Sequence, residues 1–347
     1  MIEKKILFVL GAGASCPYGY PSGSELRRLI LYNAGSFSGG FLDSYRNFKS
    51  KDLDQSKKHT KLQQIKQFIE TFNGAVKSID VFIANNSKFA PIGKYIIAFE
   101  IFRTEQESRF REEIQPAKEH LEHHDNRQYV LGKAGFQGGD WYSYLFKRIT
   151  DGLVGRDALP DFSNGNISFI TFNYDRSLEY FFYDSLRCLY YEVAEDKKVQ
   201  ALNHLKILHV YGNIAHLKWQ NPCDYVDYKQ QINESILQNA ANKIRTVYEE
   251  KENPEVIEAK NLLQQADQIF FLGFGFAREN MEVLGLPGLI SEDCLILGTV
   301  LGLEPKEIND IRDQIVKGLK HGGITDRNLN RVKLENVDCL KLLRNYL

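Results

Sequence analysis

The chain has 347 residues, enough for one large domain with an insertion or for two domains. Its hydrophobic content of 43% and charged content of 26% are ordinary for a globular enzyme. The net charge of -1 provides no overall attraction to nucleic acid or to an anionic membrane, and no apolar run is long enough to span a bilayer. We therefore expect neither direct nucleic-acid binding nor membrane association.

The five cysteines are widely scattered and form no C-x-x-C pair. No neighbouring histidine completes a zinc-ligand spacing, so no metal site is predicted. Several cysteines stand in apolar runs, which favours buried, reduced thiols in a soluble cytoplasmic protein.

The chain starts with an apolar strand that runs into a glycine turn. Residues 6–23 read ILFVLGAGASCPYGYPSG and lead into SELRRLILYN, which predicts strand, turn and helix. Gly11 and Gly13 permit positive φ and let backbone N–H groups approach a ligand, and a helix N-terminus carries partial positive charge. This geometry suits a diphosphate, although Cys16 stands where the G-x-G-x-x-G fingerprint has its third glycine.

A helical insertion is predicted after this first βα unit. KLQQIKQFIETFNGAVKS has apolar residues at helical spacing, Ser78 can cap a short helix, and KYIIAFEIFRTEQESRFREEIQ predicts a longer helix ending near Pro116. We therefore expect a nucleotide-binding domain, residues 1–34 and 140–347, interrupted by a helical insertion, residues 35–139.

Strands and helices alternate in the rest of the chain. A helix is predicted from Asp140, and a long polar helix at 233–266 with a break near Pro254. Apolar strands are predicted at 167–175, 205–213, 268–276 and 293–303, with a last strand and helix in VKLENVDCLKLLRNYL. Such alternation implies a parallel sheet with helices on both faces, so the expected fold is Rossmann-like α/β.

Four predicted strands end in residues that can bind a ligand or react with it. They are GAGAS (11–15), FNYD (172–175), HVYGN (209–213) and GFGFAREN (273–280). In an open parallel sheet the ligand lies outside the carboxyl ends of the strands. One such ending is common because turns favour Gly, Asn and Asp, so the ordered set of four carries the prediction.

This ordered set resembles the sirtuin family and, more closely, the sirtuin-like NAD hydrolases of bacterial antiphage defence. The resemblance covers the sheet-forming parts of nearly the whole chain and omits the helical insertion. It implies that the NAD diphosphate and the nicotinamide pocket are contacted by Gly11, Ala12, Gly13, Ser15, Gly19 and Pro21. It also implies an adenosine-side loop formed by Gly273, Gly275 and Asn280.

The Thr-x-Asn-x-Asp motif of sirtuins is matched by Thr171, Asn173 and Asp175. The resemblance implies that Asn173 orders a water near the nicotinamide ribose. It also implies that Asp175 lines the carboxamide pocket or fixes nearby backbone, while a purely structural Asx turn stays open as an alternative.

The chain departs from the sirtuin pattern at the catalytic histidine. Tyr211 stands directly before Gly212, and the nearest histidine is His209, two residues earlier. Period-2 alternation would place both side chains on one face of a strand, so we predict that His209 is the catalytic base and that Tyr211 and Gly212 line the pocket. A buried, hydrogen-bonded His209 is the alternative, and His216 is a weaker candidate.

The paired cysteines that hold the zinc ribbon of protein-deacetylating sirtuins are absent from this sequence. The resemblance therefore implies water as the acceptor and an NAD hydrolase that releases nicotinamide and ADP-ribose during phage infection. It also implies a homo-oligomer and a separate ATPase partner, such as a HerA-type helicase.

Other functions stay open at this point. They are an NAD-dependent protein deacylase and a non-enzymatic sensor of NAD or ADP-ribose. A dehydrogenase is least favoured, since no acidic residue ends a second strand shortly after the first helix. A nuclease is not supported, because the sequence shows no cluster of carboxylates that could bind a metal. The role of Asp80 also stays open, as either a helix-capping residue or a further site residue.

Overall fold

The computed structural model describes residues 4–35, 55–74, 78–108, 139–155, 158–246, 249, 253–319 and 326–347. These residues contain a six-stranded sheet in the order β3-β2-β1-β4-β5-β6, with every neighbouring pair parallel. The strands are β1 (Ile6–Leu10), β2 (Ile167–Thr171), β3 (Lys206–His209), β4 (Gln268–Leu272), β5 (Leu295–Thr299) and β6 (Val332–Glu335). This order is that of a doubly wound Rossmann-like sheet, which confirms the expected fold.

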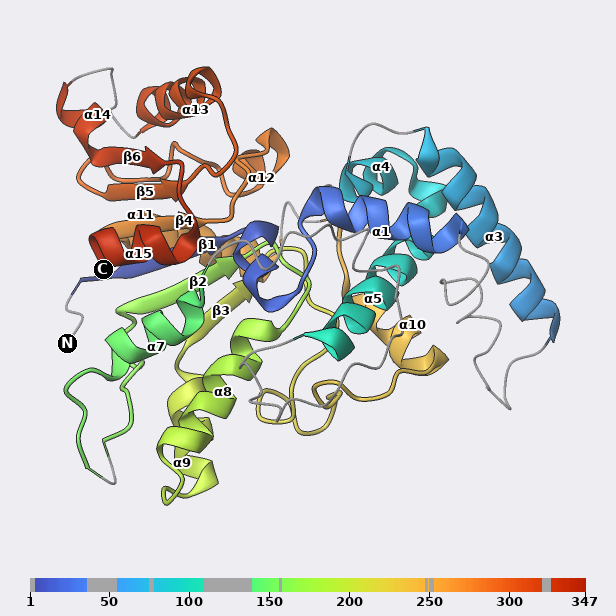
Figure 1. Cartoon of the computed structure of the whole chain (residues 1–347), viewed down its shortest axis with the longest axis horizontal. Helices are drawn as coiled ribbons and strands as arrows, with labels where there is room; N and C mark the ends of the chain where they lie inside the picture. The colour runs from blue at the N-terminus through green and yellow to red at the C-terminus, as the bar shows by residue number, and fades with distance from the viewer. Residues whose placement is uncertain are drawn as a thin grey trace, which may run out of the picture.

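Helices surround the sheet and also form a separate group beside it (Figure 1). Those that accompany the sheet are α7 (Trp141–Thr150), α8 (Ser177–Leu189), α9 (Glu195–Asn203), α11 (Pro254–Gln265), α12 (Arg278–Val283), α13 (Pro305–Gly318), α14 (Asp326–Arg331) and α15 (Cys339–Tyr346). The group beside the sheet comprises α1 (Gly23–Gly35), α3 (Gln55–Asn73), α4 (Ile79–Asn85), α5 (Ala90–Glu107) and α10 (Glu234–Lys243). We call this second group the helical lobe.

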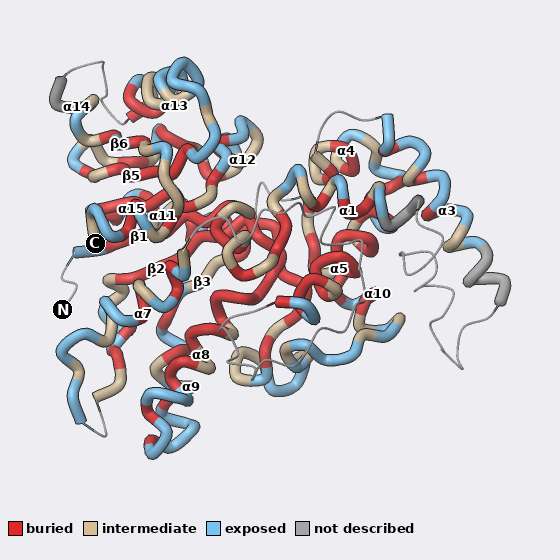
Figure 2. Tube along the Cα trace, viewed as in Figure 1, coloured by how far each residue is buried: buried red, intermediate tan, exposed pale blue. Residues whose placement is uncertain are grey.

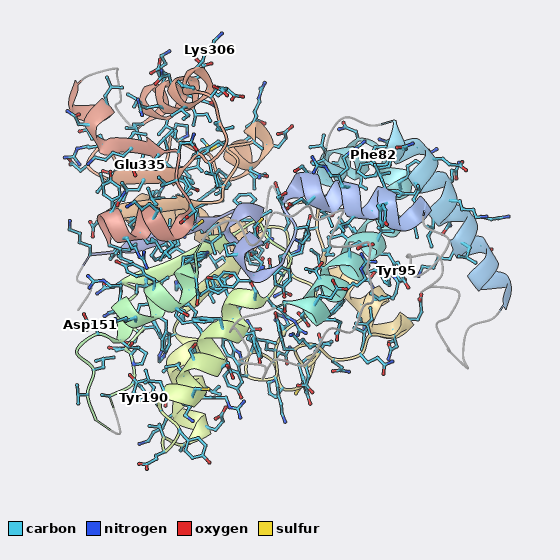
Figure 3. All side chains as sticks on the ribbon, viewed as in Figure 1. Phe82, Tyr95, Asp151, Tyr190, Lys306 and Glu335 are labelled. Atoms are coloured by element: carbon cyan, nitrogen blue, oxygen red, sulfur yellow. The ribbon has the colours of Figure 1, made fainter. Side chains whose placement is uncertain are left out.

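The helical lobe draws on three separate parts of the chain. Helices α3, α4 and α5 come from the predicted insertion, α1 precedes it, and α10 follows β3. Both α1 and α10 pack against α5. An aromatic cluster in this lobe joins Phe82, labelled in Figure 3, to Phe68, Phe72 and Phe89 at ring-centroid distances of 5.0–5.8 Å.

The central strands are buried along their whole length (Figure 2). Helices cover both faces of a parallel sheet, which is why these strands read as continuous apolar runs. Phe8 of β1 stacks between Phe169 of β2 and Phe270 of β4, with centroids 5.1 and 5.3 Å apart. This aromatic row holds the three strands whose ends carry most of the predicted site.

The predicted strands were too long at their carboxyl ends, because the polar and glycine residues there form loops. The predicted helix at 233–266 is two helices, α10 and α11, and α11 begins at Pro254 with Asn253 as its cap. Proline at the first helical position is favourable because its missing N–H has no intrahelical partner. Helix α5 ends at Glu107, and the predicted end near Pro116 lies outside the described residues.

All five cysteines are free thiols, as expected, but only Cys294 and Cys339 are buried. Cys16 is half-buried, whereas Cys188 and Cys223 are exposed. No helix in the described ranges is long and apolar enough to cross a membrane.

These positions predict two classes of thiol. Burial raises the pKa of Cys16, Cys294 and Cys339 to about 12, so little thiolate forms there at pH 8. In a colorimetric thiol titration at pH 8, Cys188 and Cys223 should react quickly and the other three only after denaturant is added. Rapid reaction of all five in the folded protein would contradict this prediction.

Candidate functional site

The four predicted strand endings meet at the carboxyl edge of the sheet. Strands β3, β2, β1 and β4 are consecutive neighbours, so their loops lie side by side (Figure 1). Figure 1 also shows the helical lobe beside this edge rather than beside the opposite one. Brought together in this way, the loops can surround one ligand.

The glycine turn after β1 does not lead directly into a helix. It forms two 3-10 turns, Ala12–Ala14 and Cys16–Tyr18, and α1 begins only at Gly23. Gly11 does not use the positive φ that a glycine permits, because it is extended at φ -106°. The N–H groups of Gly11 and Gly13 donate to the carbonyls of Leu272 and Gly273, at 3.0 and 3.1 Å, and are therefore already engaged.

The loops after β1 and β4 approach each other so closely that Gly11, Gly13 and Gly273 have no room for a side chain. A Cβ at Gly11 would lie 2.4 Å from the Gly273 carbonyl oxygen, and one at Gly13 would lie 2.9 Å from Gly273 Cα. Gly273 has φ +56°, and a Cβ there would lie 2.1 Å from Ala14 N. Gly275 differs, because nothing lies within 4 Å of its Cβ position. The loops after β1 and β4 therefore pack backbone to backbone at the point where the strand order reverses.

Asn173 is buried between the loops after β1 and β2. Its Nδ2 donates to the Gly11 carbonyl at 3.1 Å and to Ser15 Oγ at 2.9 Å. Since a carbonyl can only accept, the amide orientation is fixed and Oδ1 points the other way. Asn173 Oδ1 has no hydrogen-bond partner in the part of the chain that the structure describes. A buried acceptor of this kind is rare and indicates a place for a water or a ligand hydroxyl.

Asp175 forms an Asx turn at the start of α8. Its Oδ1 accepts from the backbone N–H of Ser177 at 3.1 Å and from the Ser177 hydroxyl. Burial raises the pKa of Asp175, although hydrogen bonds from Ser177 and Ser15 oppose the shift. The Tyr142 hydroxyl lies 2.8 Å from Ser177 Oγ and extends this network to α7. This geometry fits the backbone-fixing role that the sequence left open.

Both ring nitrogens of His209 face hydrogen-bond acceptors. Nδ1 lies 2.9 Å from the Asn173 backbone carbonyl, and Nε2 lies 2.6 Å from Glu179 Oε1 on α8. Burial alone would lower the pKa of His209, but the Glu179 carboxylate and the Asn173 carbonyl raise it above its usual value. His209 is thus the buried, hydrogen-bonded histidine of the alternative reading, and its catalytic role stays a prediction.

Tyr211 points to a different element from His209. Its hydroxyl donates to Asn280 Oδ1 of α12 at 2.8 Å. The expectation that the two side chains share a strand face is wrong because β3 ends at His209 and Tyr211 lies in the following turn. Gly212 has φ +71°, and a Cβ there would lie 2.1 Å from the Lys243 carbonyl oxygen, so this glycine serves backbone packing.

The remaining predicted residues shape the loops. Thr171 Oγ1 accepts from Asn173 N at 3.1 Å, and Gly19 ends the second 3-10 turn with φ 90°. Pro21 is buried just before α1, and Ala12 begins the first 3-10 turn. His216 is half-buried, and burial lowers its pKa.

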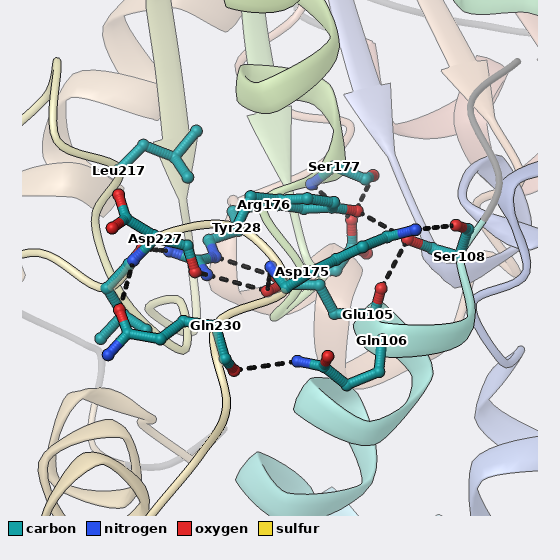
Figure 4. Close-up of polar contacts among 12 residues, drawn as sticks. Glu105, Gln106, Ser108, Asp175, Arg176, Ser177, Leu217, Asp227, Tyr228 and Gln230 are labelled. Atoms are coloured by element: carbon teal, nitrogen blue, oxygen red, sulfur yellow. Dashed lines mark hydrogen bonds and ion pairs between the residues drawn. The ribbon is translucent and has the colours of Figure 1, made fainter.

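A buried ion pair lies beside the site (Figure 4), and no pattern in the sequence predicted it. Arg176 Nε and Nη2 donate to the two carboxylate oxygens of Glu105 at 2.9 and 2.8 Å, and both side chains are fully buried. Arg176 also donates to the carbonyls of His216, Val226 and Asp227. Glu105 belongs to α5, so this pair ties the helical lobe to the loop that holds Asn173 and Asp175.

A second tie involves Asp80, whose role the sequence left open. Ser78 caps α4, whereas Asp80 accepts a hydrogen bond from the Tyr174 hydroxyl. Burial raises the pKa of Asp80, and the bond from Tyr174 opposes that shift. In the segment 173–177, therefore, Asn173 and Asp175 face the glycine turn while Tyr174 and Arg176 bind the helical lobe. These four side chains differ in role because their partners lie far away in the sequence. No local sequence pattern could therefore have predicted the two contacts with the helical lobe.

A cavity of about 120 Å³ lies at the opposite, amino end of the strands. Lys5, Ser168, Lys206 and Gln265 are among the residues that line it, and it contains none of the predicted site residues. Among the described residues, no cluster of three or more His, Cys, Asp or Glu could hold a metal ion.

Comparison with known proteins adds no assignment. No protein-family model matches the chain, and no curated protein matches it.

Proposed function

We propose that the chain is an NAD⁺ hydrolase that binds its substrate at the carboxyl edge of β1, β2, β3 and β4. The observation that carries this proposal is the buried Oδ1 of Asn173 at the junction of these loops, which has no hydrogen-bond partner among the described residues. A ligand hydroxyl or a water would satisfy this acceptor, and a ribose or its attacking water supplies such a group.

The reaction requires little acid–base chemistry. The bond between the ribose C1′ and the nicotinamide nitrogen breaks, and nicotinamide leaves with the electron pair. Water adds to the resulting oxocarbenium-like carbon and loses a proton to solvent, which gives ADP-ribose. Asn173 Oδ1 accepts a hydrogen bond from that water and orients it, and orientation of this kind provides much of the catalysis.

The resemblance to antiphage NAD hydrolases suggests the conditions in which this activity operates. On this proposal the enzyme works in the cytoplasm as a homo-oligomer and is activated during infection with a HerA-type ATPase. The ties from Asp80 and Glu105 to the segment 173–177 provide a route by which a partner on the helical lobe would act on the site.

The test measures nicotinamide and ADP-ribose released from NAD⁺ by the purified protein, alone and with the co-expressed ATPase. We expect Asn173→Ala to lower the rate by about 100-fold or more, because the attacking water loses its orienting acceptor. The matched control is Asn309→Ala on the exposed face of α13, which should leave the rate unchanged. Release of nicotinamide by Asn173→Ala at the wild-type rate would contradict the proposed role.

One observation favours a second candidate, a non-enzymatic sensor of NAD or ADP-ribose. Both nitrogens of His209 are engaged, so the predicted base offers no free lone pair. A sensor would bind NAD⁺ or ADP-ribose in calorimetry and release no nicotinamide with or without the ATPase. That pair of results would replace the hydrolase proposal.

A further inference from the structure

We infer that His209 and Glu179 form a buried positioning pair, in which the imidazole holds the backbone carbonyl of Asn173 and thereby sets the position of the Asn173 amide. His209 then acts through Asn173 and is not the proton acceptor of the reaction. The kinetic part of this inference rests on the proposed function, whereas its spectroscopic part does not.

The hydrogen-bond partners determine where the protons lie. Nδ1 of His209 faces a carbonyl, which can only accept, so Nδ1 carries a hydrogen. Nε2 faces the Glu179 carboxylate at 2.6 Å, so a further proton lies between these two atoms. Whichever of the two atoms holds that proton, the Nε2 lone pair is not available to a substrate.

The surroundings favour an ionised pair. Glu179 is 1% exposed and stands in the first turn of α8, where the helix dipole stabilises a negative charge. Asp175, in the loop before α8, adds negative charge near His209, and His216, in the loop after β3, opposes it. Burial by itself lowers the pKa of His209, and the Glu179 carboxylate, the Asn173 carbonyl and Asp175 together raise it above its usual value.

The pair holds the backbone of Asn173, the residue whose side-chain amide forms the centre of the proposed site. Asn173 N donates to Thr171 Oγ1, and the Asn173 carbonyl accepts from His209. The next carbonyl, that of Tyr174, accepts from Ile214 N at 3.0 Å. Each of these contacts fixes the backbone from which the Asn173 amide reaches Gly11 and Ser15, so loss of the His209 contact would move the unpartnered Oδ1.

The pH dependence separates positioning from base catalysis. Above the raised pKa of His209 only one ring proton remains for two acceptors, the Glu179 carboxylate and the Asn173 carbonyl. The carboxylate is the stronger acceptor, so Nδ1 loses its hydrogen, Asn173 is released and activity falls as pH rises through that pKa. A catalytic base must instead be deprotonated, so activity would rise over the same range. The two roles thus predict slopes of opposite sign.

Two substitutions of Glu179 test the pair. In Glu179→Gln the amide can donate to a neutral Nε2, so Nδ1–H still holds Asn173 while the proton at Nε2 is lost. We expect this variant to lose the alkaline fall in kcat. In Glu179→Ala no donor or acceptor faces Nε2, and we expect kcat to fall about 100-fold because the amide is misplaced. Glu258→Gln, at an exposed ion pair with Lys206, is the matched control.

Side-chain ¹⁵N NMR of labelled histidine provides the readout that does not depend on activity, with His209→Asn for assignment. We expect the signals of wild-type His209 to show a proton on both nitrogens up to a higher pH than those of Glu179→Gln, in which only Nδ1 keeps its proton. The Asn173 side-chain amide signals should move in Glu179→Ala and stay in place in Glu179→Gln. Thermal unfolding shows whether each variant is folded.

Two results would overturn the inference. One is a wild-type His209 that lacks a proton on Nδ1 at a pH below its own pKa, and the other is a wild-type rate that rises with pH through the pKa of His209. If the wild type releases no nicotinamide under any condition, the proposed function fails, and the NMR signals alone then decide whether the pair positions Asn173.

Discussion

Glu105→Gln is expected to lower the free energy of unfolding by about 3–5 kcal/mol, because it leaves the Arg176 guanidinium buried without its counter-charge. Both partners are fully buried, and Arg176 has its other hydrogen bonds to three backbone carbonyls. The guanidinium therefore cannot reach water without breaking the loop that follows β3. Urea unfolding followed by circular dichroism measures the loss.

Two further variants show that charge is the cause. Glu70→Gln removes an exposed carboxylate from α3 in the same helical lobe and should change stability by less than about 0.5 kcal/mol. In the double variant Glu105→Met with Arg176→Met, apolar side chains of similar length replace the pair, and part of the loss should be recovered. Recovery should be incomplete because the carbonyls that Arg176 binds lose their donor. A loss below about 1 kcal/mol for Glu105→Gln would contradict this account.

Gly273→Ala is expected to destabilise the protein by about 2–5 kcal/mol, through unfavourable backbone conformation and overpacking together. Gly273 has φ +56°, and its added Cβ would lie 2.1 Å from Ala14 N and 2.3 Å from Gly13 C. The loops after β1 and β4 must separate to admit it, which also displaces Ser15 from Asn173. We therefore expect nicotinamide release to be lost together with stability.

Gly275→Ala is the matched control within the same segment. Its Cβ position is open, so stability should change by less than about 0.5 kcal/mol. If the adenosine side of NAD⁺ contacts Gly275, this variant raises KM without changing the unfolding midpoint. Equal destabilisation by the two alanines would contradict the packing explanation of the glycine motif.

The positions of the strands could be predicted because a strand buried on both faces is apolar at every position, which is visible in the local sequence. ILFVL at 6–10 and QIFFL at 268–272 are continuous apolar runs, which in this length range indicate central strands. The strand ends were placed too late because a run such as ITFNYD has no internal signal for the last paired residue. Pairing stops at Thr171 because the neighbouring strands β1 and β3 end opposite this residue, at Leu10 and His209.

The site was predicted in part for the same reason. Polar residues directly after buried strands must lie at the carboxyl edge, so Asn173 and Asp175 could be placed there from the sequence. Their partners could not, because Ser15 lies 158 residues away from Asn173 in the chain and Glu105 lies 71 away from Arg176. No spacing rule connects positions so far apart.

By itself the sequence determined which segments are strands and helices, that the sheet is parallel, and that four loops meet at one edge, since hydrophobic period and turn residues act locally. The order of the strands within the sheet came from the structure. The tertiary structure decided what each residue of those loops does. Gly11 and Gly13 face Gly273 rather than open space, and His209 faces Glu179, so backbone packing and a buried charge pair occupy groups that the sequence had assigned to a ligand. The role of each of these residues depends on which backbone group or carboxylate, distant in sequence, lies beside it in space. Only the tertiary structure determines that neighbour.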